Sequence, residues 1–506
     1  MIKNIIANIV GRFWSILTNY LFIPLYISLL GIENYAVISF SFILIGVMSV
    51  MDAGLTATLS REFAKNDEGG KLDHKMRVLN TLETCYWIIV VVIILIIFVF
   101  ARPIAEKWIT LKVLDISYVS TALKIFGASM ALQLLGNFYI GGLIGLERQV
   151  KANLYQVIWG VFKNGLVLLV IFFRPSLIYF FAWQGIVTLI YILFLRFSLV
   201  KSITSGVLNA TKVFLFDKML LRTIGGFVGG MLLISIVAAI NTQLDKIAIS
   251  KLLPIEELGY YNLGISLTQV LMVLVSPVAM ALLPRFTLLY SQKKNAEADH
   301  LFYTIMLLVV IFIFSIAASI MFYSRELIFI WTANPVLALS SSKYVLYLAL
   351  GTAMLATQVI PFNIAIANGY TKINTIMGIL SLFISIPGYW ISVSYLGPKG
   401  AAITWCIIQT ITMPLYLYYI HKKFLKEYSY SSLIFNNILF PACSAIAIGF
   451  IISLLIPHLQ NRIGELALIG LATLLTLIVV TFITMPLGKI RLYYSVVKNR
   501  LVSFKR

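Results

Sequence analysis

Six basic residues stand inside, or at the ends of, long apolar stretches of the sequence. They are Arg12, Arg61, Lys124, Lys163, Lys246 and Arg285. A charged group at the centre of a membrane-crossing helix raises the free energy of insertion by about 2.5–3.5 kcal/mol, so it usually faces a cavity or a partner. Arginine binds phosphate bidentately, and lysine binds it as a point charge. We therefore expect these residues to line a cationic cleft that receives an anionic headgroup.

The position of each basic residue along its stretch favours different environments. Arg61 and Arg285 lie near the ends of their stretches, from which a long side chain can reach the membrane surface. Lys246 can lie at the opposite surface. Lys124 and Lys163 lie farther from either end, so we expect their side chains to line a cavity.

Two aspartates are candidates for gating or coupling. Asp52 lies about nine residues from the inner end of its stretch, or roughly 13 Å at 1.5 Å per residue. It can pair with Arg12 or Lys163 as a structural tie, or it can act as a protonation or gating switch. Asp245 lies near the outer end of the seventh stretch. Glu83, at the start of the third stretch, is expected at the membrane surface.

Amide side chains also gather in these apolar stretches. They are Gln133, Asn137, Asn153, Asn164, Asn241, Gln243, Gln358, Asn363 and Asn368. Sugars need hydrogen-bond donors and acceptors, and amides offer both. The candidates for contact with a glycan are Gln133, Asn137, Asn164, Asn241, Gln358 and Asn363. The alternative is hydrogen bonding between helices, which contributes about 0.6 kcal/mol per bond on average.

The sequence carries no motif of nucleotide or hydrolytic chemistry. It has no Walker-type phosphate loop, no H-E-x-x-H and no Ser/His/Asp spacing. The four histidines fall in predicted loops, and the three cysteines are far apart without paired spacing. We therefore expect neither an enzyme nor a bound metal or cofactor.

Apolar helices must position these polar residues, because 60% of the chain is hydrophobic and only 11% is charged. Soluble proteins carry about 25% charged residues, so this composition excludes an ordinary soluble enzyme and a disordered chain. A membrane-crossing helix needs about 20 apolar residues. We predict an all-α polytopic membrane protein with 14 spans: 7–30, 36–60, 79–101, 117–145, 150–173, 177–200, 222–250, 257–288, 300–323, 342–368, 371–395, 399–420, 434–456 and 463–486. The spans 117–145 and 222–250 are interrupted by polar residues.

The basic residues set the orientation of these spans. With the N-terminus in the cytoplasm, about 27 of the 39 Lys and Arg residues fall on the cytoplasmic side. Both termini are then cytoplasmic. The net charge of +20 is explained by this bias, without nucleic acid as a partner.

Two sequence matches at one offset predict an internal repeat. The segment 27–35 resembles 249–260, and 151–153 resembles 372–374, at an offset of about 222 residues. An even number of spans per unit gives a parallel repeat of two six-helix lobes around a central cleft. The predicted domains are an N-terminal lobe (1–200), a cytoplasmic linker (201–221), a C-terminal lobe (222–425), two extra helices (426–488) and a basic cytoplasmic tail (489–506).

Four motifs resemble one family. The segment 51–64, MDAGLTATLSREFA, resembles the D-x-G-L-x-x-x-x-x-R-x-x-A motif of Wzx-type polysaccharide flippases, in the multidrug/oligosaccharidyl-lipid/polysaccharide (MOP) exporter superfamily. The segments 245–261, 276–285 and 142–148 fit as well, so the resemblance runs from residue 1 to about 425. It implies a bacterial inner-membrane protein that moves undecaprenyl-diphosphate-linked oligosaccharide units, most commonly O-antigen, to the periplasmic face. The resemblance implies coupling to an ion gradient. Membrane lipids, an O-antigen polymerase and a chain-length regulator are the expected partners.

Other functions remain open at this point. A lipid II flippase or a multidrug exporter of the same superfamily, a membrane O-antigen polymerase and a non-enzymatic scaffold of the assembly complex are the alternatives. A multidrug exporter would favour acidic groups in the cleft, whereas this chain has more lysine there. A polymerase would need a large outer loop, and the longest predicted ones, 102–116 and 324–341, are short.

Overall fold

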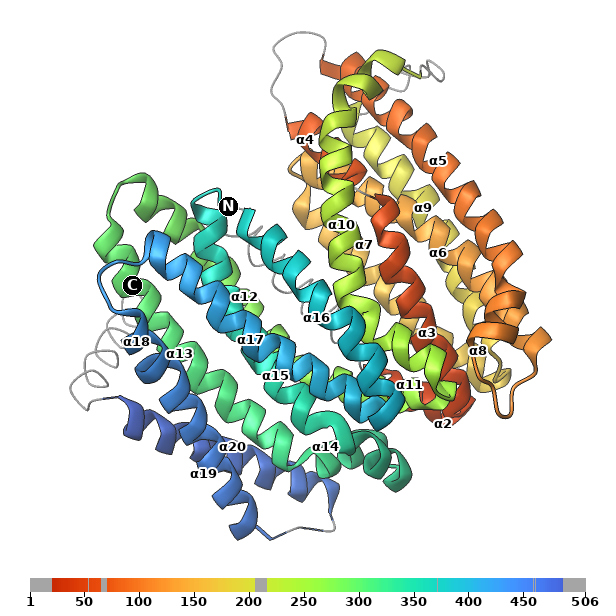
Figure 1. The fold of residues 1–506 in the computed structure, drawn as a ribbon. Coiled ribbons are helices and arrows are strands. Elements are labelled where there is room, and N and C mark those ends of the chain that lie inside the picture. The colour runs from red at the N-terminus through yellow and green to blue at the C-terminus, as the bar shows by residue number, and fades with distance from the viewer. Residues whose placement is uncertain are drawn as a thin grey trace, which may run out of the picture. The chain divides into compact units, whose positions relative to one another are not determined.

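The computed structural model describes residues 21–52, 54–64, 71–204, 216–370, 372–457, 459 and 461–485 (Figure 1). In this part of the chain the regular structure is helical, apart from one isolated bridge between Thr110 and Pro254. The described residues form two compact units. The first consists of residues up to Asn262 together with Ser385–Pro398, and the second consists of Leu263–Ile384 and residues from Lys399 onwards.

The helices up to the boundary between the units account for the first half of the chain. They are α2 (Ile23–Leu30), α3 (Ile32–Met48), the 3₁₀ helix η1 (Ser49–Asp52), α4 (Leu55–Ala64), α5 (Lys71–Pro103), the π-helix η2 (Ile104–Trp108), α6 (Ile116–Gly145), α7 (Gln149–Gly160), the π-helix η3 (Val161–Gly165), α8 (Val167–Phe173), α9 (Leu177–Ile203), α10 (Lys218–Leu252) and α11 (Ile255–Thr268). The boundary falls within α11.

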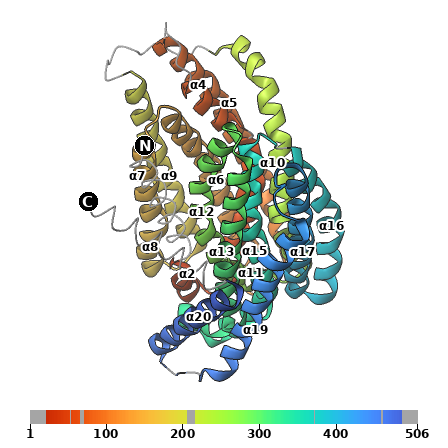
Figure 2. The same ribbon diagram turned by 90° about the vertical axis from the view of Figure 1, so that its left-hand side faces the viewer.

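The remaining helices belong to the second unit, apart from the end of α16 and the first residue of α17. They are α12 (Val270–Ser291), α13 (Asn295–Phe322), α14 (Ser324–Thr332), α15 (Pro335–Ala367), α16 (Lys372–Leu396), α17 (Pro398–Phe424), α18 (Tyr430–Ser432), the π-helix η4 (Leu433–Leu439), α19 (Phe440–Leu455) and α20 (Arg462–Thr484). Helices α19 and α20 pack beside α13, as two views of the ribbon show (Figures 1 and 2).

Twelve helices of the described part are long and apolar enough to cross a membrane. They correspond to 12 of the 14 predicted spans, including 117–145, which is the single helix α6 despite its polar residues. Most of the first predicted span, 7–30, lies outside the described residues, and the seventh, 222–250, lies on the helix α10. Helix α10 belongs to the first compact unit, together with the helices before it. The lobe boundaries, which rest on the sequence repeat, stay a prediction.

The second predicted span, 36–60, is found as a candidate span over Ile32–Asp52, but it does not continue to residue 60 as one helix. Helix α3 ends at Met48, a 3₁₀ turn follows, and α4 starts afresh at Leu55. Gly54 has φ +85°, which suits glycine because other residues rarely adopt it. The Asp52 carboxylate accepts hydrogen bonds from the Thr56 backbone N–H at 3.3 Å and from its hydroxyl at 2.6 Å, so it holds the start of α4. Hydropathy alone does not reveal such a break.

Glycines on α6 allow α4 to pack against it closely. A Cβ atom on Gly145 would lie 2.5 Å from the Ser60 carbonyl oxygen and 2.8 Å from its Cα atom. At Gly141 the added atom would meet Thr56, and at Gly142 it would meet Leu199 and Leu59. The segments 51–64 and 142–148 are therefore two sides of one helix contact.

Gly145→Ala should destabilise the protein, because its new methyl group meets backbone atoms that cannot rotate away. Overpacking of this kind typically lowers stability by about 1–3 kcal/mol. The measurement is the unfolding temperature of the purified protein in detergent. The control is Gly470→Ala on α20, where an added Cβ meets nothing within 4 Å. Equal unfolding temperatures for the two variants would contradict the close contact.

The loop 109–115, which we call the connecting loop, is bound by side chains of two other segments of the first unit. The buried Glu33 carboxylate accepts bonds from the backbone N–H groups of Lys112 (2.6 Å), Val113 (3.1 and 3.2 Å) and Leu114 (3.1 Å). The Lys112 ammonium donates to Glu256 at 2.7 Å, which raises the pKa of Lys112. The connecting loop thereby ties the α2–α3 turn to the α10–α11 turn.

Candidate functional site

Lys163 lies on the π-helix η3, between α7 and α8. A π-helix is rare, and single turns of it occur often at functional sites. The Trp183 indole N–H donates to the Phe162 carbonyl at 3.0 Å, which satisfies a backbone group beside the irregular turn. The predicted cavity-lining lysine is therefore presented by an irregular turn that a neighbouring helix stabilises.

Neutral groups surround the Lys163 ammonium. Its Nζ donates to the Gln133 side-chain oxygen at 2.8 Å and lies 4.7 Å from the centre of the Trp159 ring. The Trp159 ring is stacked on Tyr191, with centroids 5.1 Å apart and an interplanar angle of 12°. Sequence analysis singled out Lys163 and Gln133 but missed both aromatic residues. In the sequence, Trp159 and Tyr191 look like ordinary bulky residues that face lipid, so nothing singles them out.

A small cavity opens next to Lys163 inside the first unit. Its polar lining includes Tyr26, Ser41, Asn164 and Gln184, and its volume is about 70 Å³. A water molecule occupies about 30 Å³ in the liquid, so the cavity is large enough for water. It has no room for a sugar ring. The Tyr26 hydroxyl donates to the backbone carbonyl of Asn164, which fixes the backbone rather than the amide of this predicted glycan contact.

Asp52 belongs to a separate cluster near the break between α3 and α4. Besides Thr56, its carboxylate accepts a hydrogen bond from the Tyr86 hydroxyl, and the Thr56 and Tyr86 hydroxyls lie 2.7 Å apart. These contacts give Asp52 a role in holding the helix start. Pairing with Lys163 is not among its contacts in the described part of the chain, and Arg12, the other predicted partner, lies outside the described residues. A switching role stays a prediction.

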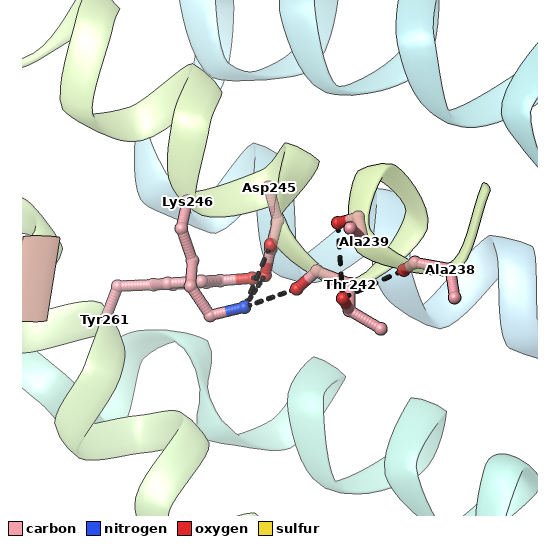
Figure 3. Close-up of polar contacts among 6 residues, drawn as sticks. All are labelled: Ala238, Ala239, Thr242, Asp245, Lys246 and Tyr261. Atoms are coloured by element: carbon pink, nitrogen blue, oxygen red, sulfur yellow. Dashed lines mark hydrogen bonds and ion pairs between the residues drawn. The ribbon is translucent and has the colours of Figure 1, made fainter. Parts of the chain in front are cut away.

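Asp245 and Lys246 form a cluster with Tyr261, in which Asp245 and Tyr261 are buried (Figure 3). The Lys246 ammonium donates to Asp245 at 3.1 Å and to the Thr242 carbonyl at 2.9 Å, and the Tyr261 hydroxyl donates to Asp245 at 3.1 Å. Asp245 is only 7% exposed. The hydrogen bond from Tyr261 joins α11 to α10 within the first unit, and Asp245 neutralises the charge of Lys246.

An ion pair that the sequence analysis missed lies among α5, α6 and α9. The Arg196 guanidinium donates to the Glu83 carboxylate at 2.6 Å, and the Tyr139 hydroxyl donates to the same carboxylate at 2.5 Å. Glu83 is 6% exposed, so its carboxylate lies in the interior among these helices, and its expected depth near the membrane surface stays a prediction. One signal in the sequence could have revealed this pair: Glu83 and Arg196 carry opposite charges, and each lies in a predicted span.

The remaining predicted site residues have varied surroundings. Arg61 on α4, Asn137 on α6 and Arg285 on α12 are exposed. The Lys124 ammonium lies 5.9 Å from the centre of the Phe98 ring. The structure thus brings Lys163, Gln133 and Asn164 into one region of the first unit.

Three predicted amides pack among helices. The Asn363 amide donates to the Ala279 carbonyl at 2.6 Å, which joins α15 to α12 inside the second unit. Asn241 donates to Val237 of its own helix at 3.0 Å. The Gln358 side-chain oxygen is buried without a hydrogen-bond partner in the described part. For Asn363 the interhelical alternative accounts for the contact.

Comparison with known proteins decides the family. The pattern of the family described as "Polysaccharide biosynthesis protein" matches residues 1–290, more than half of the chain. The chain belongs to this family. The MatE family pattern matches residues 231–391. A curated relative from Shigella flexneri, described as "Putative O-antigen transporter", is 21% identical over 400 residues, which cover 79% of this chain and 92% of the relative.

Solved structures share the fold of this polysaccharide biosynthesis family member. A lipid II flippase MurJ in an inward closed conformation matches with TM-score 0.73 and 16% identity, over 96% of this chain and 98% of that one. An inward-facing MATE family multidrug transporter of the MOP superfamily matches with TM-score 0.65 and 14% identity, over 83% and 95%. The chain is therefore a member of the polysaccharide biosynthesis family whose fold is that of these solved membrane proteins.

Proposed function

We propose that this transporter moves undecaprenyl-diphosphate-linked oligosaccharide units, with O-antigen units as its cargo, from the cytoplasmic to the periplasmic leaflet of a bacterial inner membrane. The family supports a lipid-linked glycan as substrate, and the Shigella relative supports O-antigen. Movement follows alternating access of two lobes, driven by an ion gradient. A polymerase and a chain-length regulator would receive the product.

The proposed architecture has 14 spans, with both termini cytoplasmic. Twelve candidate spans support it, and α10 supplies a further long helix where the seventh was predicted. The sequence repeat supports two parallel six-helix lobes around a central cleft, followed by two extra helices. In this orientation the connecting loop lies on the periplasmic side.

The contact set of Lys163 is the observation that carries the proposal. A lysine inside a membrane unit normally pairs with an acid, but the recorded partners of Lys163 are an amide and an aromatic ring. Its charge is therefore available to an anionic substrate. We propose that Arg12, Arg61, Lys124 and Arg285 add positive charge along the path. Lys246 contributes less, because Asp245 already neutralises it.

The proposal is tested by deleting the gene for this protein in the native host. Surface polysaccharide is scored on gels, and linked units are extracted from membranes and assayed for their leaflet. Loss of polymer with accumulation of single units on the cytoplasmic side is the expected result. Single units that reach the periplasmic face would instead indicate a polymerase. Unchanged polysaccharide would contradict the proposal and point to lipid II or drug transport.

Lys163→Ala should reduce surface polysaccharide at least tenfold at unchanged protein level, since one charge-assisted contact contributes about 1.5–3 kcal/mol. The measurement is quantitative gel analysis of the complemented deletion strain. Lys201→Ala, at the exposed end of α9, serves as the control and should retain wild-type polymer. Wild-type polymer in both variants would remove Lys163 from the path.

A further inference from the structure

One side of α17 presents a continuous row of exposed side chains. Steps of three or four residues link these positions, so they lie on one face of the helix. Aliphatic residues come first, tyrosines follow, and a lysine ends the row: Ile407, Ile411, Leu415, Tyr418, Tyr419 and Lys422. The first five of these residues are 42–48% exposed. The face therefore changes from apolar to aromatic to cationic towards the C-terminal end of α17.

The loop that follows α17 is held in place by two hydrogen-bonding side chains. The buried Asp299 carboxylate, on α13, accepts hydrogen bonds from the backbone N–H groups of Lys426 at 2.8 Å and Glu427 at 3.1 Å. The His421 imidazole donates to the Tyr428 carbonyl at 2.7 Å. These bonds fix the exposed Lys426 directly after the end of α17, so a second lysine joins the cationic end of the face.

Positive charge is in excess at this end of α17. Residues 421–428 contain three lysines and one acidic residue. The Lys423 ammonium lies 3.4 Å from the centre of the Tyr370 ring, so it is engaged in a cation–π contact. Among the residues that the structure describes, neither Lys422 nor Lys426 belongs to an ion pair. Two ammonium groups are therefore available to an anion from outside the chain.

The length of the row fits one leaflet of a bilayer. Helix α17 is one of the candidate spans, and Ile407 and Tyr419 are 12 residues apart along it. This separation corresponds to roughly 18 Å at 1.5 Å per residue. The hydrocarbon of one leaflet is about 15 Å thick, half of about 30 Å. Tyrosines gather at the level of lipid headgroups, so the lysines that follow them lie at the phosphate groups.

We propose that the lysine face, which consists of the row on α17 together with Lys426, binds an anionic phospholipid of the surrounding bilayer, such as phosphatidylglycerol. The phosphate group contacts the ammonium groups of Lys422 and Lys426, the tyrosine hydroxyls lie at the level of the glycerol esters, and one acyl chain follows the aliphatic side chains. In the proposed orientation this lipid belongs to the cytoplasmic leaflet, where anionic headgroups attract basic residues beside a membrane-crossing helix.

The occupant is a resident lipid rather than the transported glycan. Ile407, Ile411 and Leu415 have neither donors nor acceptors for sugar hydroxyls in their side chains. A zwitterionic lipid carries no net charge, so two ammonium groups attract it less strongly than they attract an anionic one. The inference goes beyond the proposed function, because it holds whichever cargo the protein carries.

The experiment uses the full-length protein, purified in detergent and stripped of lipid. Native mass spectrometry measures the dissociation constants of dioleoylphosphatidylglycerol and dioleoylphosphatidylcholine. The variant Lys422→Gln/Lys426→Gln removes both charges, and Lys422→Arg/Lys426→Arg keeps them. The matched control is Lys343→Gln/Lys399→Gln, which removes two exposed lysines elsewhere in the second unit. Unfolding temperatures without added lipid verify that the variants fold.

We expect affinity for dioleoylphosphatidylglycerol to fall about 25-fold in the double glutamine variant, because each lysine next to an anionic lipid contributes about fivefold. The double arginine variant and the control should bind this lipid as wild type does. Affinity for dioleoylphosphatidylcholine should be weaker and equal in all four proteins.

A second measurement locates the lipid on the wild-type protein, and it tests the proposal even if the glutamine variant fails to fold. A photoactivatable phosphatidylglycerol is crosslinked to the protein, and peptide mapping should find the adduct within residues 407–428. Wild-type affinity for phosphatidylglycerol in the folded glutamine variant, equal binding of the two lipids by wild type, or an adduct confined to other residues would overturn the proposal. Displacement of the photoactivatable lipid by equimolar undecaprenyl phosphate would also overturn it, because the lysine face would then belong to the cargo carrier.

Discussion

Arg196→Met should lower the stability of the protein by about 3 kcal/mol. Removing one partner of a buried ion pair typically destabilises a protein by about 3–5 kcal/mol, because the other charge stays buried without compensation. We expect the lower end of that range, because the Arg196 side chain is 49% exposed whereas that of Glu83 is 8% exposed. The measurement is thermal unfolding in detergent, followed by size-exclusion fluorescence.

The double variant Glu83→Gln/Arg196→Met should recover most of this loss, since it removes the uncompensated charge and leaves an amide for the Tyr139 hydroxyl. Arg174→Met, an exposed arginine after α8, is the control for loss of a surface charge. If Arg196→Met unfolds at the same temperature as this control, the ion pair does not stabilise the packing of α5 against α9.

Glu33→Ala should release the connecting loop. The carboxylate accepts bonds from three successive backbone N–H groups, and a hydrogen bond to a charged group contributes about 1.5–3 kcal/mol. Hydrogen–deuterium exchange at residues 112–114 should therefore accelerate at least tenfold, because local opening becomes easier. Mass spectrometry of peptides that contain these residues measures the change directly.

Lys112→Met is the matched control for this prediction. It keeps the Lys112 backbone bond to Glu33 and removes only the exposed ion pair with Glu256, which solvent screens. Exchange at the same residues should change little. Comparable acceleration in the two variants would mean that the ion pair holds the connecting loop as strongly as the Glu33 carboxylate does, which would contradict the prediction.

The apolar patterning of the sequence predicts the spans well, because hydropathy reports what a helix must bury or expose to lipid. It does not reveal the break at Asp52, since a 3₁₀ turn and a glycine with positive φ leave the average hydropathy high. The break depends on one carboxylate competing for the backbone N–H of Thr56, which is a local geometric effect.

The candidate site, too, could be predicted from the sequence only in part. Lys163 is recognisable in the sequence because a charge far from both ends of an apolar stretch is unusual. Its aromatic neighbours Trp159 and Tyr191 resemble ordinary lipid-facing residues until folding stacks them together. The Glu83–Arg196 pair joins residues 113 positions apart, so only the packing of α5 and α9 reveals it. Single charges are visible in a sequence, whereas their partners are a property of the fold.

The connecting loop has a practical consequence for topology mapping. Val113 is 82% exposed and lies in a short segment between two candidate spans, which makes it an attractive place for an epitope tag or a reporter fusion. Its backbone N–H, however, is one of the three that bond to Glu33. A tag inserted at this position would separate the α2–α3 turn from the α10–α11 turn, and the reporter would describe a rearranged protein rather than the native one.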